Sequence, residues 1–153
     1  MVRLGLISDT HNLLRPQAVE ALRGCSRILH AGDICDAKVL EQLRTLAPVT
    51  AVRGNNDWGP WADELQEREV VRVENVDILV IHDVADLRSE GVPAGVRVVV
   101  CGHSHKPRVQ EQAGVLYVNP GSAGPRRFKL PIAVGELLVH GAEVRARTIE
   151  LTA

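Results

Sequence analysis

The sequence has few aromatic residues and almost no excess of charge of either sign. Phe, Trp and Tyr together make up 3% of its 153 residues, and the formal net charge at pH 7 is −1. Few rings leave little for stacking on bases, and a nearly neutral chain exerts no long-range attraction on nucleic acid or on an anionic membrane. We therefore expect no nucleic acid and no membrane among its partners, and any attraction for phosphate has to be local.

Long apolar runs and paired cysteines are also missing. No apolar run approaches the roughly 20 residues of a membrane-spanning helix, and residues 1–9 turn polar too early for a signal peptide. The three cysteines, Cys25, Cys35 and Cys101, form no CxxC pair. We interpret them as small buried thiols in a reducing compartment rather than as a disulfide or metal ligands. Together these absences predict a cytoplasmic protein.

The composition and the order of apolar runs predict an α/β domain over residues 1–153. Hydrophobic residues make up 45% of the chain and charged residues 24%, which is typical of a globular protein. Strand-like runs at 4–7, 27–31 and 49–52 alternate with helical patterns at 16–23 and 37–46. Helices of about ten residues between strands are typical of βαβ crossovers and a parallel sheet.

The second half of the chain changes character. Residues 86–90 form a weak helical stretch, and Asn75 and Gly141 mark tight turns. We expect mostly antiparallel strands here, at 69–74, 76–81, 96–101, 115–118, 132–139 and 144–151. The whole pattern predicts two packed sheets flanked by helices.

Five short polar motifs follow these strand-like runs directly. Oxygen and imidazole ligands at the ends of consecutive strands are what a two-metal hydrolytic site needs. Open α/β sheets bind their ligands beyond the carboxyl ends of their strands, so the repeated placement favours one shared site. The motifs are Asp9-Thr10-His11, Gly32-Asp33, Gly54-Asn55-Asn56-Asp57, Ile81-His82 and Gly102-His103-Ser104-His105.

Two of the motifs contain ligand pairs spaced two residues apart. Side chains at i and i+2 of an extended segment point the same way, so Asp9 and His11 could reach one metal ion. His103 and His105 have the same spacing. Either pair alone is more often a capping and packing arrangement, but two pairs, both at strand ends, favour a metal site.

The motifs D-x-H, G-D, G-N-x-D, H and G-H-x-H, in this order, resemble the calcineurin-like metallophosphoesterase superfamily across essentially the whole chain. Asn119-Pro120-Gly121-Ser122 is similar to a further signature of that superfamily. The resemblance is to its small single-domain phosphodiesterase branch, which is also similar to the retromer subunit Vps29. It implies a four-layered αββα sandwich of two mixed sheets flanked by helices, in agreement with the strand and helix pattern.

The resemblance also implies the ligands of two metal ions. The set lacks thiolate and suits Mn²⁺, Ni²⁺, Zn²⁺ or Fe²⁺ without choosing among them. The first ion would be held by Asp9, His11, Asp33 and His105, and the second by Asp33, Asn55, His82 and His103, so that Asp33 bridges the pair.

The implied activity is hydrolysis of a small-molecule phosphodiester by a hydroxide that bridges the two ions. With two divalent cations, the carboxylates of Asp9 and Asp33 and one hydroxide, a charge of about +1 remains to neutralise a diester monoanion. Two other functions stay open: a Vps29-like interaction scaffold with an inert metal site, and a phosphomonoesterase. A homo-oligomer through the C-terminal hairpin also stays open.

Position 56 departs from the common superfamily pattern. Many members have histidine directly after the asparagine ligand, whereas this chain, like the branch it resembles, has a different residue, Asn56. An amide can donate a hydrogen bond to a phosphoryl oxygen but cannot deliver a proton. We assign catalytic roles to Asp33 and Asn56 and expect a preference for esters with good leaving groups.

Other residues near the motifs have both structural and functional interpretations. Asp57 is expected to brace the loop of Asn55 by hydrogen bonding, and His30 to pack behind the ligands. Asp83, where the family often has glycine, is expected to be a turn residue rather than an extra charge near the second ion. The basic cluster at 126–129 is interpreted as solvated surface, although it could meet an anionic substrate.

Overall fold

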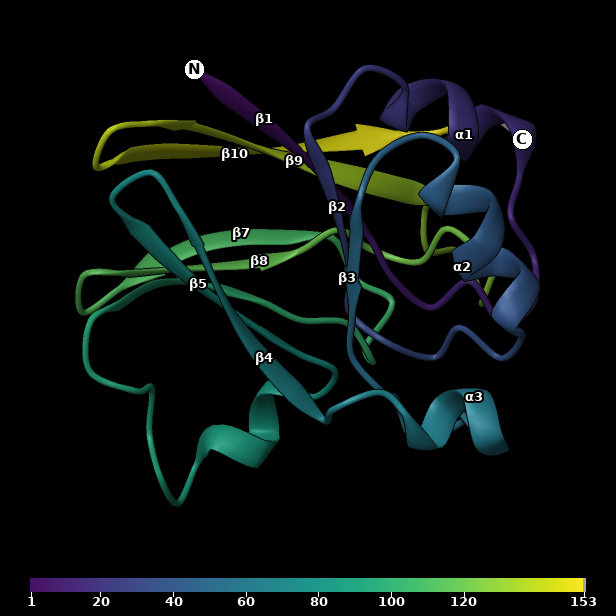
Figure 1. Cartoon of the computed structure of the whole chain (residues 1–153), viewed down its shortest axis with the longest axis horizontal. Helices are drawn as coiled ribbons and strands as arrows, with labels where there is room; N and C mark the ends of the chain where they lie inside the picture. Colours follow the sequence, from purple (N-terminus) through teal and green to yellow (C-terminus); the bar gives the residue numbers. More distant parts are fainter. Residues whose placement is uncertain (153) are drawn as a thin grey trace.

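The computed structural model describes residues 1–152, whose strands form two mixed five-stranded sheets (Figure 1). In the first sheet β1 pairs in parallel with β2, and β2 with β3, as the βαβ pattern predicts. β9 lies antiparallel to β1 and to β10. This sheet has the order β10-β9-β1-β2-β3 and consists of β1 (Val2–Ile7), β2 (Arg27–His30), β3 (Val49–Ala51), β9 (Ala133–His140) and β10 (Glu143–Glu150).

The second sheet is less antiparallel than the sequence predicts. The hairpins β4–β5 and β7–β8 are antiparallel, but β6 pairs in parallel with both β5 and β8. The segment between β5 and β6, residues 82–95, is long enough for the crossover that parallel strands require. The sheet has the order β4-β5-β6-β8-β7 and consists of β4 (Arg68–Val73), β5 (Val76–Ile81), β6 (Val96–Val100), β7 (Arg108–Gln112) and β8 (Val115–Asn119).

The helices are short and begin and end at recognisable residues. α1 (Pro16–Leu22) starts with proline at its first turn, and the carboxylate of Asp36 caps α2 (Ala37–Arg44) by accepting from the Lys38 N–H at 2.9 Å. A 3-10 helix, η1 (Val84–Leu87), stands near the predicted weak helix. α3 (Pro60–Asp63) was not predicted, because four residues are too few for a helical period.

Three buried clusters define four layers and confirm the predicted αββα sandwich. Leu6 and Leu29 of the first sheet pack against Val80 and Val100 of the second. Leu22 of α1 and Leu40 of α2 cover the other face of the first sheet. The fourth layer is thin: Leu87 of η1 packs with Leu79 and Val99 on the outer face of the second sheet. No helix in the described residues is both long enough and apolar enough to span a bilayer.

The loops after β1, β2, β3, β5 and β6 meet at one end of the sandwich. The Asp9 N–H donates to the carbonyl of Gly32 at 3.0 Å, which joins the first two loops. The Gly102 N–H donates to the carbonyl of His82 at 2.9 Å, which joins the loops of the second sheet. All five sequence motifs lie in these loops, so the fold brings them to one place.

Candidate metal centre

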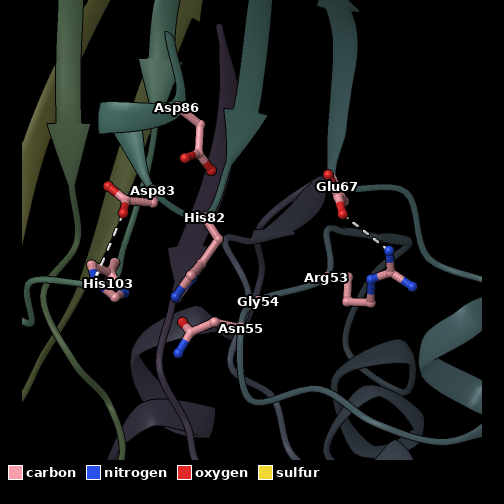
Figure 2. A pocket seen from close by; sticks show the side chains of 8 residues that line it. All are labelled: Arg53, Gly54, Asn55, Glu67, His82, Asp83, Asp86 and His103. Carbon is pink, nitrogen blue, oxygen red and sulfur yellow. Dashed lines mark hydrogen bonds and ion pairs between the residues drawn. The ribbon is translucent and has the colours of Figure 1, made fainter. Parts of the chain in front are cut away.

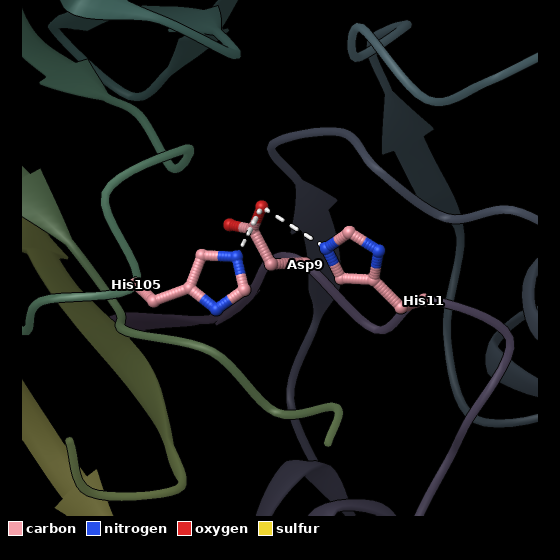
Figure 3. A group of neighbouring side chains, drawn as sticks. All are labelled: Asp9, His11 and His105. Atoms are coloured by element: carbon pink, nitrogen blue, oxygen red, sulfur yellow. Dashed lines mark ion pairs between the residues drawn. The ribbon is translucent and has the colours of Figure 1, made fainter. Parts of the chain in front are cut away.

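Asp9, His11 and His105 form one group of converging ligand atoms. The Nε2 atoms of His11 and His105 lie 3.8 and 3.4 Å from Asp9 Oδ1. Figure 3 shows the two rings on either side of the carboxylate, each with a nitrogen toward the same oxygen. The two ring centroids are 5.3 Å apart. Three donor atoms so close together could hold one metal ion.

Asp33 and His82 join this group on its other side. Asp33 Oδ2 lies 3.6 Å from His11 Nε2 and 3.4 Å from His82 Nε2. Asp9 Oδ1 is also 4.0 Å from His82 Nε2, and Asp9, Asp33 and His82 form a second potential ligand set. Asp33 therefore lies between the two histidines, and Asp9 is the residue common to both ligand groups.

His103 and Asn55 line a pocket of about 290 Å³ together with His82 (Figure 2). The rings of His82 and His103 stand nearly perpendicular, with centroids 5.2 Å apart. His103 is about half exposed, and its Nε2 lies 3.7 Å from Asp83 Oδ2. The structure thus places His103 beside His82, and His105 beside His11.

The sequence argument from extended backbone is wrong for both ligand pairs. Asp9 and His11 have φ angles of 54° and 44°, and His103 and His105 have 70° and 64°, so none of the four is extended. His103 and His105 consequently point to different neighbours, although Asp9 and His11 do converge. Left-handed backbone is strained for such residues, at about 1–3 kcal/mol each, and persists only where surrounding contacts enforce it. The strain here is concentrated at the ligand loops.

Hydrogen bonds leave one ligand atom free on Asp9 and one on His82. Asp9 Oδ2 accepts from the Ser8 hydroxyl at 2.6 Å and from the His103 N–H at 3.1 Å, so Oδ1 remains. The Nδ1 of His82 is 2.8 Å from the carbonyl of Ala31; as the donor there, it leaves the Nε2 lone pair facing Asp33. These contacts fix both side chains in orientations suited to a metal ion.

The carboxylate of Asp57 ties two ligand loops together. Its Oδ1 accepts from the N–H groups of Ile34 and Cys35, both at 2.8 Å. Its Oδ2 accepts from the N–H groups of Asp33 at 3.0 Å and Gly54 at 2.8 Å. Asp57 is 6% exposed. One buried side chain thus satisfies four backbone donors around Asp33.

Asn56 faces Asp33 in this structure. Its backbone N–H donates to Asp33 Oδ1 at 2.9 Å, and its side-chain amide donates to Asp33 Oδ2 at 3.0 Å. To donate to a phosphoryl oxygen, as the sequence predicts, this side chain would have to rotate away from Asp33. Asn56 is exposed.

His30 is fully buried behind the ligands. Its Nδ1 accepts from the Gly32 N–H at 3.1 Å, which leaves Nε2 to donate to the Thr10 hydroxyl, also at 3.1 Å. That hydroxyl in turn donates to the carbonyl of Ile34 at 3.3 Å. Burial lowers the pKa of His30 to about 3, so the ring is neutral at pH 7. His30 supports the loops and has no free nitrogen for a metal ion.

The negative charge of the two aspartates dominates the electrostatics. Burial raises the pKa of Asp9, but His105, His11 and Ser8 outweigh it and hold that pKa far below its usual range. Burial likewise raises the pKa of Asp33, and His82 and Asn56 reverse the effect. Both carboxylates are therefore ionised at neutral pH, as metal ligands must be.

The pKa values of His11 and His82 shift in the opposite direction, upward. Asp9 raises the pKa of His11, while burial and the charge of Arg127 oppose that rise. Burial lowers the pKa of His82, but Asp33 outweighs burial, so the pKa is raised overall. The neighbouring thiol of Cys35 stays protonated, because burial and then Asp57 raise its pKa to about 11. The donors around the site are thus oxygen and imidazole, without thiolate.

Four buried polar atoms at the centre have no hydrogen-bond partner within the described residues. A buried polar atom without a partner costs about 1–3 kcal/mol, so three such atoms that face one another, on Asp9, His11 and His82, call for a ligand. Each is a nitrogen or a carboxylate oxygen, and the residues fit a bound metal ion. The four atoms are Asp9 Oδ1, His11 Nε2, His82 Nε2 and His105 Nδ1.

Two glycines allow the loops to approach this closely. A Cβ on Gly54 would collide with the backbone nitrogen and Oδ1 of Asp33. A Cβ on Gly102 would lie 2.6 Å from Asp9 Oδ2 and would collide with the Ser8 hydroxyl. Neither ligand carboxylate could keep its position beside a larger residue.

Asp83, a further sequence candidate, lies beside the centre. Asp83 is the predicted turn residue, because its Oδ1 caps η1 through the Ala85 N–H at 3.0 Å, but its other oxygen also faces His103.

Sequence reasoning missed the supporting role of Ser8 and Ser122. The hydroxyl of Ser122 donates to the carbonyl of Asp9 at 3.1 Å, and the amide of Asn119 donates to the carbonyl of Gly102 at 3.0 Å. The only available signal was the Asn119–Ser122 signature, since a serine before Asp9 carries no distinctive spacing. The segment after β8 therefore holds the first and last ligand loops together.

Comparison with known proteins is consistent with this geometry. Residues 2–141 match the calcineurin-like phosphoesterase superfamily domain. The chain is 35% identical to a probable metallophosphoesterase of Methanothermobacter thermautotrophicus, over 95% of this chain and 91% of that protein. It is 26% identical to a phosphodiesterase of Methanocaldococcus jannaschii, over 97% of this chain and 100% of that protein.

Solved structures show the same fold. Vacuolar Protein Sorting 29 from Cryptosporidium parvum superposes with a TM-score of 0.79, over 99% of this chain and 98% of that one. The sequence identity of the pair is 21%, so the likeness concerns the fold alone.

Proposed function

The chain belongs to the calcineurin-like phosphoesterase superfamily, and from that premise we propose that it is a metal-dependent phosphodiesterase. The observation that carries the proposal is the set of unpartnered buried atoms on Asp9, His11, His82 and His105. A protein that used this end of the sandwich only as a rigid surface would gain nothing from leaving them without partners.

We assign two divalent ions to the site, of Mn²⁺, Ni²⁺, Zn²⁺ or Fe²⁺. When bound, the ions supply the positive charge that neutralises phosphoryl oxygens and lowers the pKa of the attacking water. Asp33 would belong to both sets. The first set would be Asp9, His11, Asp33 and His105, and the second would be Asp33, Asn55, His82 and His103.

The protein's own residues position the reactants. In the hydrolysis, the attacking water releases a proton to solvent and its oxygen forms a new bond to phosphorus, the ester P–O bond breaks, and the leaving oxygen takes up a proton. Asn56 can orient a phosphoryl oxygen through its amide but holds no transferable proton. The proton therefore comes from solvent, and esters whose leaving groups are stable as anions react fastest.

The charge of the pocket beside His82 favours a diester over a monoester. Asp83, Asp86 and Glu67 line this pocket, and its one arginine, Arg53, is already paired with Glu67 at 3.1 Å (Figure 2). A phosphomonoester is close to a dianion at pH 7, whereas a diester carries one charge. Repulsion from the acidic side chains therefore disfavours the monoester more.

Turnover of bis(4-nitrophenyl) phosphate by the purified protein tests the proposal. We expect hydrolysis with Mn²⁺, Ni²⁺ or Zn²⁺ and none after chelation, with slower hydrolysis of the monoester 4-nitrophenyl phosphate. Asp33→Ala and His103→Ala should each reduce turnover more than about 100-fold, since even residues that only support metal ligands cost 10–100-fold.

Two variants serve as matched controls in this assay. His140→Ala removes an exposed histidine at the end of β9, and Asp63→Ala removes an exposed carboxylate on α3. Both should retain wild-type turnover. No metal-dependent turnover, or turnover that survives both ligand substitutions, would favour the Vps29-like scaffold instead.

A further inference from the structure

An exposed aromatic and basic loop stands beside the metal centre. Between β8 and β9 the chain makes a tight turn in which the Leu130 N–H donates to the carbonyl of Arg127 at 3.1 Å. Phe128, at the tip of this turn, is 88% exposed and has a φ angle of 53°. Left-handed backbone is uncommon for a bulky residue, and exposure of a whole ring leaves apolar surface in water.

The base of the loop is fixed to the ligand loops. The Ala123 N–H donates to the carbonyl of Ser8 at 3.1 Å, and Arg15 donates to the carbonyl of Gly124 at 3.3 Å. Ser122 is bonded to the carbonyl of Asp9. The exposed tip is thus held at a defined place relative to the metal centre.

Two adjoining hollows connect the metal centre to Phe128. The first, of about 260 Å³, is lined by His11, His105, Pro125, Arg126 and Arg127. The second is a groove of about 800 Å³. Arg127 lines both, so the groove lies next to the hollow that His11 and His105 line. The groove is lined by Ser104, Lys106, Arg127, Phe128, Lys129 and Leu130.

The cations of this region have no acidic partner. Within residues 1–152, Lys106, Arg126, Arg127 and Lys129 form no ion pair. The pocket on the opposite side of the centre carries Glu67, Asp83 and Asp86 instead. A chain of net charge −1 therefore places positive charge on one side of the site and negative charge on the other.

We propose that this groove is a substrate subsite, which binds a planar ring against Phe128 and a second anionic group on Arg127, Lys106 and Lys129. The inference rests on the proposed phosphodiesterase function and specifies its substrate class: a phosphodiester that carries a ring and a further phosphate, as a 5′-phosphorylated dinucleotide does. The reacting phosphate lies at the metal centre. An exposed ring supplies stacking, and unpaired cations supply attraction for the second phosphate.

A membrane surface is the other ligand that a ring among cations could bind. The substrate is favoured because Ser104 and Lys106 belong to the same loop as the ligands His103 and His105, and form the groove with the turn. A lipid anchor needs only the tip of the turn and gains nothing from a groove that the loop of His103 and His105 helps to form.

Phe128 is the only phenylalanine in the chain, which makes a direct binding test available. Protein labelled with 4-fluorophenylalanine gives one ¹⁹F resonance, from position 128. Metal-free protein, which cannot turn over, is titrated with 5′-phosphorylated diadenylate, with diadenylate lacking that phosphate, with inorganic phosphate, and with phosphatidylglycerol vesicles.

We expect both dinucleotides to shift the resonance, the phosphorylated one at roughly three- to fivefold lower concentration, as an exposed ion pair predicts. Inorganic phosphate should leave it unchanged. Arg127→Ala should abolish the difference between the dinucleotides, whereas Lys38→Ala, an exposed lysine on α2, should preserve it. A resonance that vesicles shift and dinucleotides do not would overturn the proposal in favour of a membrane surface.

Kinetics with added metal provide the second readout. Phe128→Leu keeps an apolar side chain but removes the ring, and should raise KM for the phosphorylated dinucleotide roughly tenfold while kcat changes less than about twofold. If bis(4-nitrophenyl) phosphate is hydrolysed but the dinucleotides leave the ¹⁹F resonance unmoved, the subsite is refuted and the phosphodiesterase stands. If the dinucleotides bind and no metal supports turnover, the phosphodiesterase is refuted instead.

Discussion

Removal of the Asp57 carboxylate should destabilise the protein as strongly as truncation of a buried core leucine does. The Asp57→Ala substitution leaves four buried backbone donors, on Asp33, Ile34, Cys35 and Gly54, without their acceptor. Each unsatisfied donor costs about 1–3 kcal/mol, and partial entry of water into the space reduces the sum. We expect a loss of about 4 kcal/mol in the free energy of unfolding.

Urea unfolding of the metal-free protein measures this loss. With an m-value of about 2 kcal/mol/M, a loss of about 4 kcal/mol lowers the urea midpoint by about 2 M. Asp57→Asn keeps one oxygen for two of the donors and turns an NH₂ group toward the other two, so it should cost at least about 2 kcal/mol. Asp63→Ala, which removes an exposed carboxylate paired to Arg53 at 3.8 Å, should cost less than about 0.5 kcal/mol.

The milder substitution Asp57→Asn should weaken metal binding while the protein remains folded. Asp57 fixes the backbone of Asp33, so Asp57→Asn should reduce Mn²⁺ affinity about 10–100-fold in calorimetry. A loss of stability below about 1 kcal/mol for Asp57→Ala, with an unchanged m-value, would show that these four hydrogen bonds do not hold the ligand loops.

Four further predictions concern the metal centre and its surroundings. A divalent metal at 100 times its Kd should stabilise the wild type by about 2.7 kcal/mol and raise Tm by roughly 5–10 °C in a thermal scan, but should not raise it in His105→Ala. Gly54→Ala should reduce Mn²⁺ affinity at least about tenfold by calorimetry, whereas Gly114→Ala, where a Cβ would meet nothing within 4 Å, should leave it unchanged. His30 has a folded pKa of about 3 and a usual pKa of 6.5, so between these pH values the unfolded chain binds one more proton, and stability falls as the pH drops through this window. His30→Gln should therefore reduce the slope of unfolding free energy against pH by up to about 1.4 kcal/mol per pH unit. An unchanged slope would contradict the assignment. Asn56→His should accelerate hydrolysis of alkyl diesters relative to aryl diesters, and an unchanged ratio would refute the argument from the missing proton donor.

The sequence alone indicated the residue types of the candidate site, their order along the chain and the fold that carries them. Periodicity of apolar residues placed every described strand except β7, and the two main helices, within a few residues of their observed ends, because burial on one face is a local property. The five motifs were visible for the same reason: each is a short run of residues after a strand. β7 was missed because all five of its residues are exposed.

Only the tertiary structure decided which atoms of these residues are free to bind. Asp9 Oδ1 remains free because Oδ2 accepts from the backbone of His103, a residue 94 positions away. The divergence of His103 and His105 follows from left-handed backbone that no spacing rule anticipates. The four bonds of Asp57 and the place of Phe128 beside the centre likewise depend on contacts between distant segments. The chemical type of each residue can be read from the sequence position by position. The direction of each candidate ligand atom depends instead on hydrogen-bond partners that are distant in the sequence and come close only in the folded protein.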